Sequence, residues 1–136
     1  MRNKGFTMVE ILVVIAIIGL LMAFLVPNLF GAQDRAKETA VKAVMHSVQL
    51  GVEAYNMENG SYPIAHNVTL KNLCDNYLVP ASYLASIPKN PYTGVEYKDS
   101  DAAGKIIYDY NDLAGKYTIT GYKRNGIIKI MELSNM

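Results

Sequence analysis

The stretch that decides the fold is the start of the chain, residues 1–30, MRNKGFTMVEILVVIAIIGLLMAFLVPNLF. A short basic leader is followed by a long apolar run. Residues 11–26 have no polar side chain, and as a helix they would be about 24 Å long, short of the roughly 30 Å hydrocarbon core of a bilayer. Extending the helix back to Phe6 gives about 31 Å. We therefore expect a membrane-spanning part over about residues 6–30, and that part includes one acid, Glu10.

Glu10 stands where a membrane helix should carry no charge. An acid there costs roughly 2.5 to 3.5 kcal/mol on insertion scales and usually has a partner. One interpretation is a capping box over residues 7–10, in which the Thr7 side chain accepts from the amide of Glu10 and the carboxylate accepts from the amide of Thr7. The other is that Glu10 meets a cation. Both remain open at this point.

Two ordinary explanations of the apolar run are weaker. A secretory signal peptide would have a cleavage site of small residues behind the run, whereas Pro27 leads here directly into a helical pattern. A plain single-pass anchor would account for the apolar run, but not for the order of residues in front of it.

Seven residues of this stretch stand in a characteristic order: Lys4, Gly5, Phe6, Thr7, Glu10, Gly19 and Pro27. The order resembles the start of type IV prepilins and type II secretion pseudopilins, and the layout is most similar to a major pseudopilin. The resemblance implies cleavage after Gly5 by a prepilin peptidase, N-methylation of the new terminus at Phe6, and pairing of Glu10 with the terminal amine of a neighbouring subunit. It also implies a filament whose helix loosens between Gly19 and Pro27.

The same resemblance implies the partners and the location of the protein. The partners would be further copies of the chain, the prepilin peptidase and methyltransferase, minor pilins or pseudopilins, and an assembly platform in the inner membrane. The protein would cross the cytoplasmic membrane once with its body outside, and would then enter an envelope or cell-surface filament. Basic residues lie on both sides of the span, so the positive-inside rule does not decide the orientation.

Composition limits the remaining possibilities. The formal net charge is +1 for 136 residues, and removal of residues 1–5 would make it slightly negative, so there is no basic field for nucleic acid. Cys74 is the single cysteine, which excludes an internal disulfide. It lies on an apolar helix face, and we interpret it as a buried core thiol.

The pattern predicts one long helix over residues 6–58. Its outer half is amphipathic, with an apolar face that repeats at helical spacing: Val41, Met45, Val48, Val52 and Tyr55. Pro27 lacks an amide, and Gly19 weakens the helix before it, so a kink is expected between them. A simple proline kink without any role in assembly is the alternative.

We expect a globular head over residues 59–136. Asn59-Gly60 is a C-cap signal, and a short helix is predicted over about residues 69–79, followed by a loop over 80–104. Residues 83–94 resemble the loop that links helix and sheet in pseudopilins, with Asn90 where those have an acid. Strand-like residues at 105–110, 117–123 and 127–133 predict a three-stranded antiparallel sheet over about 105–133. The fold class is α+β, a long helix packed on a small sheet.

The sequence shows no catalytic motif, so we expect no enzyme. No cofactor is expected, except that calcium is considered because major pseudopilins bind it near their end. Oxygen atoms for calcium could come from Asp99, Asp101, Asp109 and Asp112, although the usual ligand string is absent and they also fit solvated turns. His46 and His66 lack partners at metal-ligand spacing and are interpreted as helix-surface and loop residues.

Two classes of function remain. The first is a structural filament subunit, a major pseudopilin or a similar type IV pilin. The second is a membrane-tethered monomeric binding or sensing domain, in which residues 7–10 only cap the anchor helix.

Overall fold

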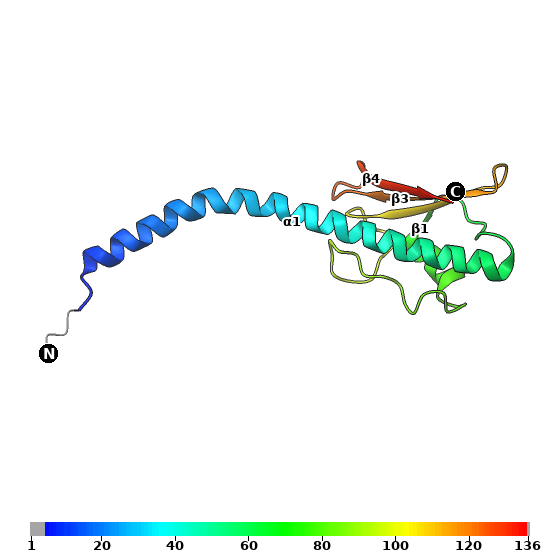
Figure 1. Ribbon diagram of the computed structural model, residues 1–136, viewed down its shortest axis with the longest axis horizontal. Coiled ribbons are helices and arrows are strands. Elements are labelled where there is room, and N and C mark those ends of the chain that lie inside the picture. Colours follow the sequence, from blue (N-terminus) through cyan, green and yellow to red (C-terminus); the bar gives the residue numbers. More distant parts are fainter. Residues whose placement is uncertain (1–4, 136) are drawn as a thin grey trace. The chain divides into compact units, whose positions relative to one another are not determined.

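The structure, a computed structural model, describes residues 5–135. The chain divides into two compact units, which we name the N-terminal unit (residues 1–35) and the C-terminal unit (residues 36–136) and describe separately. Helix α1 (Met8–Asn59) contributes to both. The other elements follow in the C-terminal unit (Figure 1): β1 (Val68–Thr69), α2 (Leu70–Leu73), the π-helix η1 (Cys74–Leu78), β2 (Ile106–Asn111), β3 (Lys116–Tyr122) and β4 (Lys129–Ser134).

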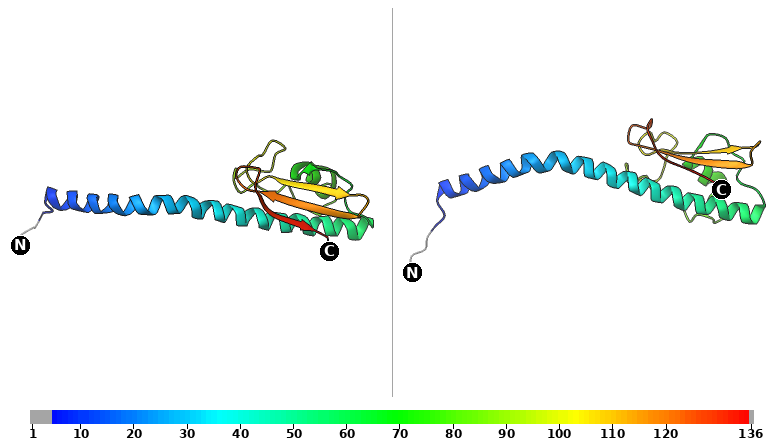
Figure 2. Two further views of the ribbon diagram at one scale, coloured as in Figure 1. Left: turned by 90° about the horizontal axis from the view of Figure 1, so that it is seen from above. Right: turned by 45° about the horizontal axis from the view of Figure 1, so that its top comes forward.

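The C-terminal unit contains a four-stranded antiparallel sheet in the order β1-β2-β3-β4. Figure 2 shows β2, β3 and β4 side by side as yellow, orange and red arrows. The sequence predicted three strands, and that number was wrong. The additional strand, β1, pairs Val68 with Tyr108 and Thr69 with Ile107. Two residues are too few to show the apolar and polar alternation that identifies a strand in a sequence, so only the pairing partner reveals β1.

The part of α1 in the C-terminal unit packs its apolar face against the sheet. Val41, Met45, Val48 and Val52 are all fully buried. A Cβ atom at Gly121 on β3 would overlap the sulfur of Met45, so glycine allows the strand to approach the helix closely. The predicted α+β fold, a long helix with an apolar N-terminal half and a small antiparallel sheet, is therefore confirmed.

Helix α1 and strand β3 run in opposite directions. Lys123, just after β3, forms an ion pair of 3.1 Å with Glu38 near the start of this part of α1. At the other end, the Tyr117 hydroxyl donates to Glu53 Oε1 over 2.6 Å. The turn between β3 and β4 therefore lies at the end of the C-terminal unit where α1 enters it.

The predicted helix over residues 69–79 consists of two parts. Thr69 caps α2, since its hydroxyl accepts from the amide of Asn72 over 3.3 Å. From Cys74 the helix becomes a π-helix, in which backbone hydrogen bonds join residues five positions apart. The Val79 amide, for example, donates to the Cys74 carbonyl over 2.9 Å. Gly51 of α1 faces this segment, because a Cβ there would lie 3.6 Å from the Leu78 side chain.

The final strand begins later than predicted. The sequence predicts a strand over residues 127–133, but β4 starts at Lys129. The side-chain oxygen of Asn125 accepts from the amides of Ile127 and Ile128, both over 3.1 Å, which holds these residues in the turn. Gly126 has a φ of 68°, a conformation that glycine adopts at little cost.

Candidate membrane anchor and assembly segment

The apolar half of α1 is uncovered in the isolated chain. Every residue from Gly5 to Gln33 is exposed, with Phe24 at 76% and Leu29 at 70%. Within the described residues, α1 is long and apolar enough to cross a membrane, with a mean hydropathy of 3.0 over its most apolar window. An apolar surface of this extent is not stable against water, so lipid or another apolar surface must cover it.

The polar group at the start of this surface is built by Thr7 and Glu10. The Glu10 carboxylate accepts from the Thr7 amide over 2.8 Å and from the Thr7 hydroxyl over 2.9 Å. In return, the Thr7 hydroxyl oxygen accepts from the Glu10 amide over 3.2 Å. These bonds make a capping box that satisfies free amides at the helix start. All three of these bonds join Glu10 to Thr7, and the two that the Glu10 carboxylate accepts both use Oε2.

The junction between Gly5 and Phe6 lies before the helix. Residues 5–7 are not helical, and Phe6 is 82% exposed. No atom would come within 4 Å of a Cβ at Gly5. The peptide bond between Gly5 and Phe6 therefore lies outside the helix, in an exposed segment. Residues 1–4 of the predicted leader lie outside the described residues.

Gly19 and Pro27 lie inside α1, which continues through both. Proline cannot donate the backbone bond of a helix interior. The side chain of Asn28 donates to the carbonyl of Phe24 over 3.3 Å beside it. A loosening of the helix between Gly19 and Pro27 remains a prediction about the assembled state.

The calcium candidates are distributed over separate parts of the C-terminal unit. Asp99 accepts from the Thr69 hydroxyl. Asp101 accepts over 3.0 Å from the side chain of Asn90 and also over 3.0 Å from the amide of Lys98. Both carboxylates hold the loop before β2 in place.

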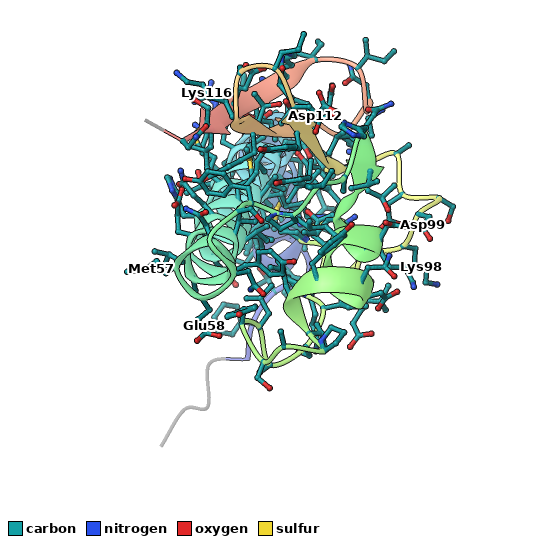
Figure 3. The ribbon with its side chains drawn as sticks, turned by 90° about the vertical axis from the view of Figure 1, so that its right-hand side faces the viewer. Met57, Glu58, Lys98, Asp99, Asp112 and Lys116 are labelled. Carbon is teal, nitrogen blue, oxygen red and sulfur yellow. The ribbon has the colours of Figure 1, made fainter. Side chains whose placement is uncertain are left out.

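Asp112 follows β2 in the turn to β3 and lies apart from Asp99 (Figure 3), and Asp109 lies in β2. Asp109 accepts from the amide of Asn67 over 2.8 Å, and Asp112 lies 3.4 Å from the His66 ring. Between residues 5 and 135, no group of three or more histidine, cysteine or acidic side chains could hold a metal ion. Calcium binding by these four residues stays a prediction.

The remaining side chains singled out from the sequence have structural surroundings. Cys74 is fully buried in the core, as predicted, and burial raises the pKa of its thiol to about 12. His46 is exposed on α1 and His66 is exposed in a loop. The Nδ1 atom of His66 lies 2.8 Å from the carbonyl oxygen of Tyr110.

Two groups of polar contacts, one around the half-buried Glu53 and one around the buried Asn90, were not found from the sequence. Glu53 accepts from the hydroxyls of Tyr62 over 3.1 Å and Tyr117 over 2.6 Å. Asn90 is fully buried and makes three side-chain bonds within its loop. Their partners are distant in sequence or belong to the backbone, so no local pattern indicates them.

An exposed apolar N-terminal helix that begins with a capping acid and continues into a small α+β unit defines a class of proteins with a single N-terminal membrane anchor. The family model described as prokaryotic N-terminal methylation motif matches residues 1–26. The chain belongs to the superfamily of type IV pilins and type II secretion pseudopilins. Members of this superfamily are structural subunits, and the chain is not an enzyme.

The relatives come from both branches of the superfamily. The type IV wide pilus major component PilA4 of Thermus thermophilus is 49% identical over 63 residues, which are 46% of this chain and 48% of that protein. Type II secretion system core protein G of Klebsiella michiganensis is 31% identical over 100 residues, 68% of this chain and 70% of the relative.

Core protein G of Escherichia coli is 33% identical over 100 residues, covering 67% of this chain and 68% of the relative. The chain thus spans about half of the Thermus protein and about two thirds of the secretion proteins. No solved structure shows a significant match.

Proposed function

We propose that the chain is a filament subunit that assembles with copies of itself through the exposed half of α1. In this proposal a prepilin peptidase cuts after Gly5, and the new terminus at Phe6 is methylated. The observation that carries the proposal is the uncovered apolar surface over residues 5–33. In a monomer only lipid can cover it, whereas in a bundle the same surfaces of several subunits cover one another.

Glu10 gives this bundle its register. Its bonds to Thr7 use Oε2, so Oε1 can accept from a further donor. Cleavage would place a new amine at Phe6, next to Thr7. An amine and a carboxylate attract more strongly in a low dielectric than in water, and a paired acid offsets the cost of an acid among lipids. The amine of a neighbouring subunit would thus fix the position of one helix against the next.

Within the superfamily, we propose a major pseudopilin of a type II secretion system. The similarity to core protein G reaches into the C-terminal unit, since it covers 68% of the chain in the Klebsiella protein. The second candidate is a subunit of a type IV pilus, favoured by the higher identity to PilA4 over a shorter part. Deletion of the gene separates the two: loss of protein export supports the pseudopilin, and loss of long surface filaments with export intact supports the pilin.

The proposal includes a location and partners. The chain would first cross the cytoplasmic membrane once, with residues 1–5 inside and the C-terminal unit outside, and the filament would later lie in the envelope or at the cell surface. Its partners would be the peptidase and methyltransferase, minor pilins or pseudopilins, and the inner-membrane assembly platform.

A pair of variants separates an assembly role of Glu10 from its capping role. Glu10→Gln removes the charge but keeps an oxygen that can accept from Thr7, since glutamine also completes a capping box. Thr7→Ala removes the two bonds of the Thr7 hydroxyl from the cap and keeps the charge. We expect Glu10→Gln to enter the membrane and to lose filaments, and Thr7→Ala to retain them. Filaments sheared from cells are measured by immunoblot against the membrane-bound pool.

The opposite pattern would support the monomeric tethered domain. If Glu10→Gln assembled normally while Thr7→Ala did not, the acid would serve the helix start alone. Mass spectrometry of the mature protein tests the processing step: we expect an N-terminus at Phe6 carrying one methyl group. A functional protein that retained residues 1–5 would contradict the proposed assembly.

A further inference from the structure

The turn between β3 and β4 presents two large apolar side chains to solvent. We name residues 123–129, Lys-Arg-Asn-Gly-Ile-Ile-Lys, the basic-apolar turn. Ile127 is 79% exposed and Ile128 is 54% exposed. Neither packs against the core of the unit. Adjacent exposed apolar side chains with basic residues on either side are typical of a surface that contacts a membrane or a protein partner.

The basic-apolar turn is held in one conformation. Asn125 accepts from both isoleucine amides, and the Lys123 amide donates to the Ile128 carbonyl over 2.8 Å. A Cβ at Gly126 would lie 2.7 Å from the carbonyl oxygen of Ala102, so the turn also packs closely on the neighbouring loop. The isoleucines are thus presented without a large ordering cost on binding.

The position of the turn decides what it can meet. Lys123 pairs with Glu38, so the turn lies at the end of the C-terminal unit where α1 enters, as Figure 1 shows for the loop before β4. Glu38 follows the last apolar residue of the spanning stretch, Phe30, by eight residues, or about 12 Å of helix. Whatever the arrangement of the two units, only this short segment of chain separates the ion-pair partner of the turn from the spanning stretch.

The charge of the turn fits a membrane surface. It carries Lys123, Arg124 and Lys129 and no acid. Lys123 pairs with Glu38 at 3.1 Å and Lys129 with Glu132 at 2.7 Å, so the electrostatic attraction to lipid phosphates is moderate. Lysine and arginine side chains at such a place extend their charged ends to the headgroups while apolar neighbours enter the interface.

We propose that the basic-apolar turn rests on the surface of the bilayer in which the chain is anchored, with Ile127 and Ile128 in the interfacial layer and the basic side chains at lipid phosphates. The anchor keeps the turn at a high effective concentration near the lipid, so a weak contact is sufficient. This contact would orient the C-terminal unit before assembly. The proposal rests on the membrane anchor of the proposed function and goes beyond it.

The chain contains no tryptophan, so one introduced tryptophan reports on its own surroundings. Ile127→Trp places the reporter in the basic-apolar turn. Leu113→Trp is the matched control, because Leu113 is also fully exposed, and its turn is also held by an asparagine, Asn111. That turn lies at the other end of the sheet. Both full-length variants are reconstituted into vesicles of phosphatidylethanolamine and phosphatidylglycerol, with and without brominated acyl chains.

We expect the emission of Ile127→Trp to shift to the blue and to lose intensity with brominated lipid, and the emission of Leu113→Trp to do neither. Replacing phosphatidylglycerol by phosphatidylcholine should weaken the quenching only partly. Brominated lipid in both leaflets makes the result independent of the orientation of the chain in the vesicle.

Equal emission of the two variants in brominated vesicles, with both proteins floating with the lipid, would overturn the surface contact and leave the anchor intact. A blue shift of Ile127→Trp that depends on protein concentration and not on bromine would assign the turn to a second copy of the chain, and would also overturn the proposal. Failure of the protein to float with vesicles would refute the anchor itself.

Discussion

Replacement of Asn90 by alanine is expected to destabilise the C-terminal unit by about 3 kcal/mol. Asn90 is fully buried, and its side chain makes three bonds: Nδ2 donates to Asp101 Oδ2 over 3.0 Å and to the Ala103 carbonyl over 2.9 Å, and Oδ1 accepts from the Tyr92 amide over 2.9 Å. Alanine would leave these three groups without their partner. A bond to a charged group contributes roughly 1.5 to 3 kcal/mol and a neutral one about 1 kcal/mol.

The measurement uses the full-length protein in detergent micelles. Thermal unfolding is followed by the near-ultraviolet circular dichroism of the ten tyrosines, all of which lie in the C-terminal unit. For a unit of this size, a loss of about 3 kcal/mol lowers Tm by roughly 10 to 20 °C. The far-ultraviolet signal of α1 would change less, because the micelle stabilises its apolar half.

Asn76→Ala is the matched control. The Asn76 side chain donates to the Asn72 carbonyl over 2.9 Å and to its side chain over 3.1 Å, but it is exposed. Water can replace these bonds, so a change within about 0.5 kcal/mol is expected. The reasoning fails if Asn90→Ala destabilises the unit no more than Asn76→Ala does.

Three further predictions concern the core. Gly121→Ala should lower the free energy of unfolding by about 1 to 3 kcal/mol because the new Cβ overlaps the Met45 sulfur. In urea titrations, the double variant with Met45→Ala should lose less stability than the sum of the two single losses. Additive losses would contradict the overlap of the two side chains. Burial raises the pKa of the Cys74 thiol to about 12, so Cys74 should resist maleimide at pH 8 until the protein unfolds; rapid labelling of the folded chain would refute its burial. Because the folded pKa lies above the unfolded value, the contribution of this thiol to stability is present below about pH 9 and is lost as the pH rises toward 12. Burial also raises the pKa of Tyr108 and Tyr117, so their contribution to the stability of the folded unit should persist below about pH 10 and be lost above it. Tyrosinate absorbance should then appear together with the loss of near-ultraviolet dichroism. Ionisation of all tyrosines before unfolding would be the contrary result.

The regular elements could largely be predicted because their signals are local. The apolar run and the Thr7-x-x-Glu10 spacing indicate an exposed helix with a capping box, since both depend on residues at most a few positions apart. The face of Val41 and Val48 shows helical periodicity, and both residues are buried in the structure. A local signal is sufficient for such features because neighbours along the chain determine them.

The turn at Asn125 shows where a local signal ends. Asn125 and Gly126 lie between two predicted strands, but the second of these strands begins two residues later than predicted. Ile127 and Ile128 have strand-forming side chains, whereas their amides are bound by the Asn125 oxygen. The hydrogen bonds of the turn therefore outweigh the preference of the two isoleucines for a β-strand.

The amino-acid sequence by itself determined the apolar helix, its capping acid and the alternation of helix and strands, because each depends on neighbouring residues. Only the tertiary structure decided that β1 joins the sheet, that Glu53 accepts from Tyr117, and that Asp101 and Asp109 accept from different backbone amides. Such contacts join residues far apart in the chain. Their energies depend on how the whole core packs, and no spacing of residue types encodes that packing.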